Sequence, residues 1–210
     1  MSDVTPIRNP EQDTLLTPQN AVLALIDYQP EQYGGVGSMD RDELVLNVTL
    51  LGKLATSFKL PVVLTTVYVK HGMSGTNQEL RDALPGVEEI DRTTMNSWED
   101  PDFRDAIKKT GRKKLILAGL WTEVCVAFPA LDAIREGYDV YVVADAIGGV
   151  STTAHEAAMQ RMIQAGAHPI TVLGLACELQ RDWGRPEADR LRAVMRAYFS
   201  GHRALAARTE

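Results

Sequence analysis

Three residues whose side chains can do covalent chemistry stand at or just beyond the ends of apolar runs. Asp27 ends AVLALID, Arg92 ends EEIDR, and Cys125 follows KKLILAG in the segment GLWTEVC. A thiol, a carboxylate and a cation brought together would suit attack of a thiolate on a carbonyl carbon. The carboxylate would take the thiol proton as general base, while the cation and a helix N-terminus would lower the thiol pKa.

Each of these residues also has a purely structural interpretation. Cys125 in EVCVAF could be a small buried apolar residue. Asp27 could cap a loop, and Arg92 could form an ion pair at the surface. Placement of all three on one edge of the fold would favour the catalytic interpretation over the three separate ones.

The order of predicted elements provides that placement. Apolar runs predict six strands, and helices are predicted between and after them; the strands cover residues 21–27, 61–67, 88–92, 113–119, 138–146 and 169–174. Alternation of this kind predicts a three-layer α/β/α fold around a mainly parallel, six-stranded, Rossmann-like sheet. Ligands bind beyond the carboxyl ends of such strands, where Asp27, Arg92 and the segment after Gly119 would meet.

The chain divides into three predicted parts. Residues 1–20 are expected to form an irregular N-terminal arm, residues 21–183 a single domain, and residues 184–210 a C-terminal helical extension. A helix carrying Cys125 is predicted over residues 122–137. Residues 30–40, with the run GGVG, are expected to form a flexible loop that could cover the site.

Composition limits the possible partners. The 210 residues carry a formal net charge of -6, and the Lys and Arg residues are scattered, which argues against nucleic acid and anionic membranes. No apolar run approaches the roughly 18 residues that span a bilayer. Two cysteines without zinc-site spacing favour a reducing, cytoplasmic setting. Cys177 is expected to be buried in a helix.

Two long motifs resemble the isochorismatase-like cysteine hydrolases. ALIDYQPEQ is similar to the first-strand signature of that superfamily, and GLWTEVCVAFPALDAIREGYDVYVVADA is similar to its nucleophile segment. RTTMNSWEDPDF and ACELQRDW resemble the YcaC-type subgroup. The resemblance implies an Asp–Lys–Cys triad in which Asp27 and Cys125 match and Arg92 replaces the lysine. Because arginine stays protonated, its role would be electrostatic.

The same resemblance implies further features of the site. A cis peptide bond would join Leu120 to Trp121, and the N–H groups of Trp121 and Cys125 would form an oxyanion hole. Further substrate-pocket positions, beside Trp121, would be Gln29, Asn96 and Trp98. The loop after the second strand offers only His71 toward a metal site, so neither a metal nor another cofactor is predicted. Homo-oligomers, up to an octamer, are expected.

The sequence therefore predicts a cofactor-free cysteine hydrolase that cleaves a small amide or related C–N bond through a thioester. Two alternatives stay open at this point. One is a family member that binds a small molecule without turning it over, since Arg92 replaces the usual lysine. The other is a thiol redox or peroxide-sensing protein in which Cys125 is oxidised reversibly.

Overall fold

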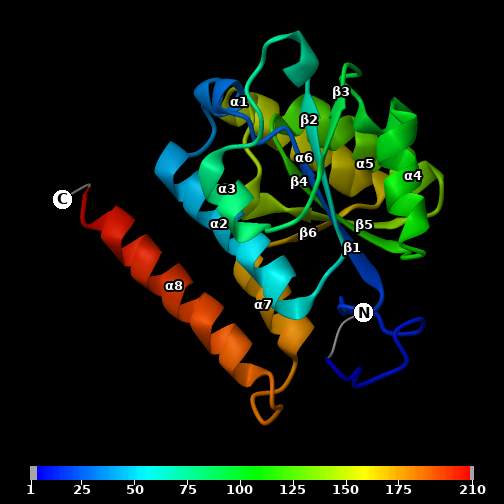
Figure 1. Cartoon of the computed structure of the whole chain (residues 1–210), viewed down its shortest axis with the longest axis vertical. Coiled ribbons are helices and arrows are strands. Elements are labelled where there is room, and N and C mark those ends of the chain that lie inside the picture. Colours follow the sequence, from blue (N-terminus) through cyan, green and yellow to red (C-terminus); the bar gives the residue numbers. More distant parts are fainter. Residues whose placement is uncertain (1–3, 209–210) are drawn as a thin grey trace.

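A single parallel sheet forms the centre of the computed structural model, which describes residues 4–208 (Figure 1). Its strand order is β3-β2-β1-β4-β5-β6, and every neighbouring pair is parallel. The strands are β1 (Ala21–Ile26), β2 (Val62–Val67), β3 (Glu89–Arg92), β4 (Lys114–Gly119), β5 (Asp139–Val143) and β6 (His168–Ile170). The predicted fold class is confirmed.

Helices cover both faces of the sheet. On one side α2 packs against α3, α7 and α8, and on the other α5 packs against α6 (Figure 1). The α-helices are α1 (Pro30–Gly34), α2 (Arg41–Phe58), α3 (Gln78–Ala83), α4 (Pro101–Lys109), α5 (Ala127–Arg135), α6 (Thr152–Ala165), α7 (Val172–Gln180) and α8 (Ala188–Ala206). Within residues 4–208, none of the helices has the length and apolar character needed to cross a membrane.

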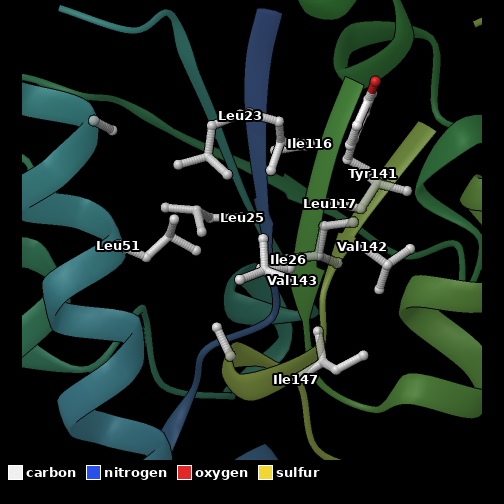
Figure 2. Close-up of a cluster of buried hydrophobic side chains, with 14 of the residues drawn as sticks. Leu23, Leu25, Ile26, Leu51, Ile116, Leu117, Tyr141, Val142, Val143 and Ile147 are labelled. Atoms are coloured by element: carbon white, nitrogen blue, oxygen red, sulfur yellow. The ribbon is translucent and has the colours of Figure 1, made fainter. Parts of the chain in front are cut away.

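The core lies where α2 and the neighbouring helices meet the sheet. Leu23 and Leu25 of β1 face Leu51 of α2, with Ile116 of β4 beside them (Figure 2). All six residues of β1 are fully buried because the sheet is covered on both faces. This burial explains why β1 reads as a continuous apolar run rather than an alternating one.

Side-chain and glycine caps mark the boundaries of α4 and α6. The Ser151 side chain accepts a hydrogen bond from the Ala154 N–H at the start of α6, and Gly166 ends that helix with φ 111°. The Asp100 side chain caps α4, whose last turn carries Lys108 and Lys109. Positive charge in the last turn is favourable because the helix dipole is negative there.

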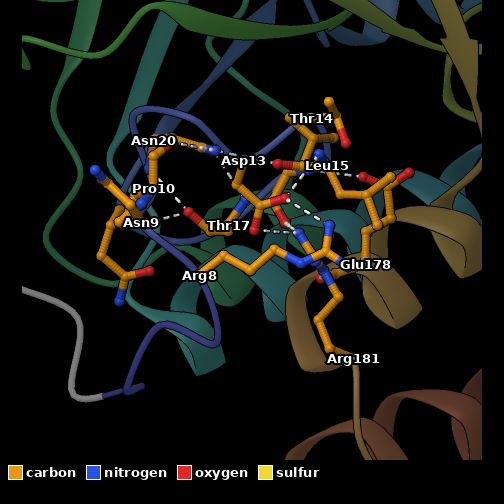
Figure 3. A network of polar contacts seen from close by, with 12 residues as sticks. Arg8, Asn9, Pro10, Asp13, Thr14, Leu15, Thr17, Asn20, Glu178 and Arg181 are labelled. Carbon is orange, nitrogen blue, oxygen red and sulfur yellow. Dashed lines mark hydrogen bonds and ion pairs between the residues drawn. The ribbon is translucent and has the colours of Figure 1, made fainter.

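The N-terminal arm is held against α7 by polar contacts (Figure 3). Asp13 pairs with Arg181 at 3.0 Å, and its side chain is almost fully buried. The Leu16 N–H donates to Glu178 Oε2 at 2.7 Å, and Lys114 Nζ donates to the Thr14 carbonyl at 2.6 Å. Residues 4–20 form neither helix nor strand, but they are anchored through both backbone and side-chain groups.

Three predicted boundaries are wrong. The sixth strand ends at Ile170, and Val172 already begins α7, because the Thr171 side chain caps that helix at the Gly174 N–H. The fifth strand ends at Val143 and continues as a 3-10 turn (Ala144–Ala146). Residues 30–40 are not an irregular loop throughout, since Pro30 starts the short helix α1.

Candidate active site

Asp27 and Arg92 form a buried ion pair at the carboxyl edge of the sheet. Asp27 directly follows β1 and has φ 59°, whereas Arg92 is the last residue of β3. The strand order places β2 between them, so the Arg92 side chain crosses the end of β2 to reach Asp27. Nη2 of Arg92 lies 2.6 Å from Oδ2 of Asp27, and neither side chain is exposed to solvent. Nη1 of Arg92 donates to the Thr94 carbonyl.

Cys125 completes this cluster from the neighbouring strand. β4 is followed by a cis peptide bond between Leu120 and Trp121 and then by a π-helical turn, Thr122–Val126. The Cys125 side chain is nearly buried and its thiol interacts with the Asp27 carboxylate. Among residues 4–208, Oδ1 of Asp27 has no well-formed hydrogen bond. It is therefore the oxygen available to receive the thiol proton.

The environment of Cys125 keeps the resting thiol protonated. Burial, followed by the charge and hydrogen bond of Asp27, raises the pKa of Cys125 to about 12. Arg92 and the Trp121 backbone N–H act in the opposite direction but do not overcome these effects. The expectation of a lowered thiol pKa is therefore wrong, because it counted the cation and helix start but not desolvation or the adjacent carboxylate.

Asp27 is the ionisable carboxyl group beside the Cys125 thiol. Burial raises the pKa of Asp27, with Asp91 adding to the effect, while Arg92 and Cys125 oppose it. Transfer of the proton from sulfur to carboxylate leaves the cluster with the same total charge, because the thiolate replaces the carboxylate as the anion beside Arg92. A buried site can make this exchange without admitting a net charge, which would be costly there.

Several contacts that the sequence does not reveal surround the nucleophile segment. The Trp121 indole Nε1 donates to the Gln32 carbonyl at 2.9 Å, and the Thr122 N–H donates to the Gly148 carbonyl at 3.0 Å. Oγ1 of Thr122 lies 2.9 Å from Nδ1 of His155, whose pKa is lowered by burial. His155 is isolated in the sequence, and only the packing of α6 on this turn brings it here.

Two predicted pocket residues, Gln29 and Asn96, have other partners. Gln29 is fully buried, and its side-chain amide binds both the N–H and the carbonyl of Val67 and also the Ser74 carbonyl. Asn96 caps the turn Ser97–Glu99 and donates to Asp132. The side chains of Gln29 and Asn96 are therefore both hydrogen-bonded to other parts of the protein.

The two tryptophans predicted in the pocket, and His71, lie in different surroundings. The Trp98 indole donates to Glu136 and its ring is buried, whereas Trp121 lies beside Cys125. His71 is exposed and stacks on Tyr68. Across residues 4–208, no cluster of three or more His, Cys, Asp and Glu side chains could hold a metal ion.

The second cysteine differs from its prediction. Cys177 lies on α7 and is exposed, so the expectation that it is buried is wrong. The position lies on the outer face of α7, whose inner face carries the buried Leu175, Ala176 and Leu179. Any measurement of Cys125 reactivity therefore has to remove the Cys177 thiol first.

Comparison with known proteins agrees with this fold. The Isochorismatase domain model matches residues 21–173. The chain therefore belongs to the isochorismatase family. The match begins at the first residue of β1 and ends in the first turn of α7, so it includes all three residues of the buried cluster.

Within that family the chain is similar to YcaC. It is 43% identical over 169 residues to the probable hydrolase YcaC of Escherichia coli strain K12, covering 80% of this chain and 81% of YcaC. The crystal structure of that protein, an octameric hydrolase of unknown specificity, superposes with a TM-score of 0.86 at 39% identity, covering 94% of this chain and 97% of that one. YcaC from Pseudomonas aeruginosa, solved with hexane-2,5-diol and covalent acrylamide, also gives 0.86, at 35% identity, covering 93% of this chain and 97% of that one. These similarities place the chain among the YcaC-like hydrolases.

Proposed function

We propose that this protein is a cofactor-free cysteine hydrolase that cleaves a small amide or related C–N bond through a thioester. The observation that carries the proposal is the contact between the Cys125 thiol and the Asp27 carboxylate, whose Oδ1 is free of other well-formed hydrogen bonds among the described residues. A base beside a nucleophile, both at the carboxyl edge of a parallel sheet, is the arrangement that acyl transfer requires.

The first half of the reaction forms the thioester. Asp27 Oδ1 accepts the thiol proton as the Cys125 sulfur attacks the substrate carbonyl carbon. The N–H groups of Trp121 and Cys125 are proposed to hold the resulting oxyanion. The C–N bond then breaks, and Asp27 returns the proton to the leaving nitrogen. An amine departs, and the acyl group stays on sulfur.

The second half releases the acid. Asp27 accepts a proton from water as the water oxygen attacks the thioester carbonyl, and the C–S bond breaks. Asp27 passes that proton to the departing sulfur, so one amide and one water become one acid and one amine. Arg92 stays protonated throughout and compensates the anion, whichever of Asp27 and Cys125 carries it.

The near-complete burial of the three side chains favours a small substrate. Covalent acrylamide in the P. aeruginosa YcaC structure supports the use of acrylamide as a probe, since it is a small amide and also alkylates thiols. The octameric state of E. coli YcaC supports a homo-oligomer for this chain, proposed here as an octamer, which light scattering would test against the 23.1 kDa chain mass.

The proposed function is tested by incubating the Cys177→Ala protein with a panel of small amides. We expect amine release and, on rapid quenching, an acyl mass increment on Cys125. Cys125→Ala is the matched control and should release nothing. Binding without amine release would favour a non-catalytic member of the family. Reversible oxidation of Cys125 by peroxide without amine release would favour a redox sensor.

A further inference from the structure

The end of helix α1 contacts the nucleophile segment through the side chain of Trp121. Two N–H groups share the Gln32 carbonyl: that of Gly35 at 3.1 Å and the indole Nε1 of Trp121 at 2.9 Å. A Cβ atom added at Gly35 would lie 2.5 Å from Cζ2 of Trp121, a separation that non-bonded carbons do not adopt. The backbone at Gly35 thus touches the indole ring, and only glycine permits this approach.

Trp121 is also held by its backbone. Its carbonyl accepts from the N–H groups of Val124 and Val126 at 3.1 and 3.3 Å. The next amide, the N–H of Thr122, donates to Gly148. Because the ring, the carbonyl and the following peptide are all held, the orientation of the Trp121 N–H, which acts on the Cys125 thiol, is held with them.

The segment that contacts the ring is itself anchored. The N–H groups of Gly37 and Ser38 both donate to the Gly149 carbonyl, at 3.0 and 3.2 Å, and the Gly149 N–H donates back to Oγ of Ser38 at 2.9 Å. The loop around Gly149 is also bonded to the turn that carries Cys125, because the Glu123 side chain accepts a hydrogen bond from the Val150 N–H at 3.1 Å. The three segments therefore form one hydrogen-bonded unit around Trp121.

From these contacts we propose that Gln32 and Gly35, here called the α1 strut, position the Trp121 backbone N–H at the Cys125 sulfur by fixing the indole. Gly35 and Trp121 are accordingly positioning residues. The proposal deepens the proposed function, on which its role in oxyanion binding rests. What the α1 strut changes directly is the surroundings of the thiol, and their effect on Cys125 reactivity can be measured without any amide substrate.

The chain supplies a matched pair of glycines for the test. Gly35 has φ -91° and ψ -4°, which alanine adopts without strain, so Gly35→Ala acts only through the contact with Trp121. Gly34 is the adjacent residue, and an added Cβ there meets nothing within 4 Å. Gly34→Ala is therefore the control for the chemical change itself.

The measurement is the rate of Cys125 alkylation by iodoacetamide as a function of pH, in the Cys177→Ala background. Asp27 and Arg92 face the thiol, and Asp91 acts on Asp27, so the profile follows the protonation of Asp27 beside these two charged groups. We expect a plateau above the pKa of Asp27. Gly35→Ala should lower this plateau about tenfold or more, since a displacement of about 1 Å can cost roughly 10²-fold in rate. Its acid-side midpoint should not move, and Gly34→Ala should match the parent.

A double substitution separates positioning from general loosening. Trp121→Phe removes Cζ2 and Nε1 and should itself lower the plateau. Adding Gly35→Ala to Trp121→Phe should then have little further effect, because the atoms that would clash are gone. General loosening would instead expose Cys125, and its rate would rise with pH like that of an ordinary thiol with a pKa of roughly 8.5.

Three outcomes would overturn the α1 strut. They are equal plateaus for Gly35→Ala and Gly34→Ala, a full Gly35→Ala effect in the Trp121→Phe background, or a parental plateau for Trp121→Phe. If Gly35→Ala does not fold, Trp121→Phe alone decides. Failure of the proposed function is separate: a parent that alkylates at Cys125 but hydrolyses no amide would refute amide cleavage and leave the α1 strut intact.

Discussion

The Arg92 guanidinium reaches past β2 to the Asp27 carboxylate, with 2.6 Å between Nη2 and Oδ2 and neither side chain exposed. A buried pair of this kind adds little net stability, because both ions lose their hydration. Its effect is local: it lets a carboxylate exist next to a thiol in a dry site.

Replacement of Arg92 should destabilise the protein as well as inactivate it. Arg92→Ala leaves Asp27 buried without its cation, so we expect unfolding free energy to fall by about 3–5 kcal/mol at neutral pH. The pKa of Asp27 should rise further, so the folded variant binds more protons than the unfolded chain, and its stability should fall as pH rises. Urea unfolding at mildly acidic and mildly alkaline pH measures this.

Two comparisons make the Arg92 prediction specific. Arg92→Lys should retain part of the activity, since it keeps the charge but lacks the planar fork. Arg135→Ala removes an ion pair with Asp132 whose arginine side chain is 77% exposed, and it should cost less than about 1 kcal/mol. Equal losses for Arg92→Ala and Arg135→Ala would contradict the burial of the Asp27 pair.

The pH dependence of turnover should have an acid limb but no alkaline limb from the thiol. Activity should be lost as pH falls through the pKa of Asp27, which is raised above 3.8 by burial, because the protonated carboxyl cannot accept the thiol proton. The pKa of Cys125, about 12, lies beyond the working range. kcat/KM measured across the pH range checks this. A rate that climbs tenfold per pH unit through neutrality would show that the thiol ionises without Asp27.

Gln29 should act on stability rather than on substrate binding. The Gln29 side chain binds the Val67 N–H at 2.8 Å and the Ser74 carbonyl at 2.7 Å, and Gln29→Ala would leave both groups without this partner. We expect a loss of at least about 2 kcal/mol of unfolding free energy. Thermal unfolding and KM should be measured together, with Gln78→Ala as an exposed control. A large rise in KM with unchanged stability would instead show that Gln29 contributes to substrate binding.

The N-terminal arm should contribute stability that depends on pH. The carboxylate of Asp13 is buried, yet the Leu15 N–H and Arg181 lower its pKa below 3.8. Its contribution is therefore fully present above about pH 4 and is lost as pH falls through the lowered folded value. Asp13→Asn should cost on the order of 2–3 kcal/mol at neutral pH and much less in acid.

Asp189→Ala is the control for Asp13, since Asp189 pairs with Arg192 but is 89% exposed. It should change stability little at any pH. If Asp13→Asn behaves like Asp189→Ala in urea unfolding at neutral pH, the arm is not anchored by Asp13.

Much of this architecture could be predicted from local patterns. Buried parallel strands must be apolar on both faces, so runs such as AVLALI mark β1 without any tertiary information. Ser151 and Gly166 mark the ends of α6 because caps act on adjacent backbone groups. Asp27, Arg92 and Cys125 could be placed on one edge for the same reason, since parallel strands present their carboxyl ends together.

The environment of those residues required the tertiary structure. The pKa of Cys125 depends on how much water is excluded and on the Asp27 carboxylate beside the thiol, and both are set by residues distant in sequence. The hydrogen bonds of Gln29 to Val67 and Ser74, and of Trp98 to Glu136, likewise join residues that no local sequence pattern relates.

The sequence by itself determined the elements, their order and the types of the reacting groups, because these follow from periodicity and from neighbours in the chain. The contact between Gly35 and the Trp121 ring was decided only when α1 packed against the segment after β4. Desolvation and close approach are properties of packed surfaces. They depend on pairs of residues that no local pattern joins.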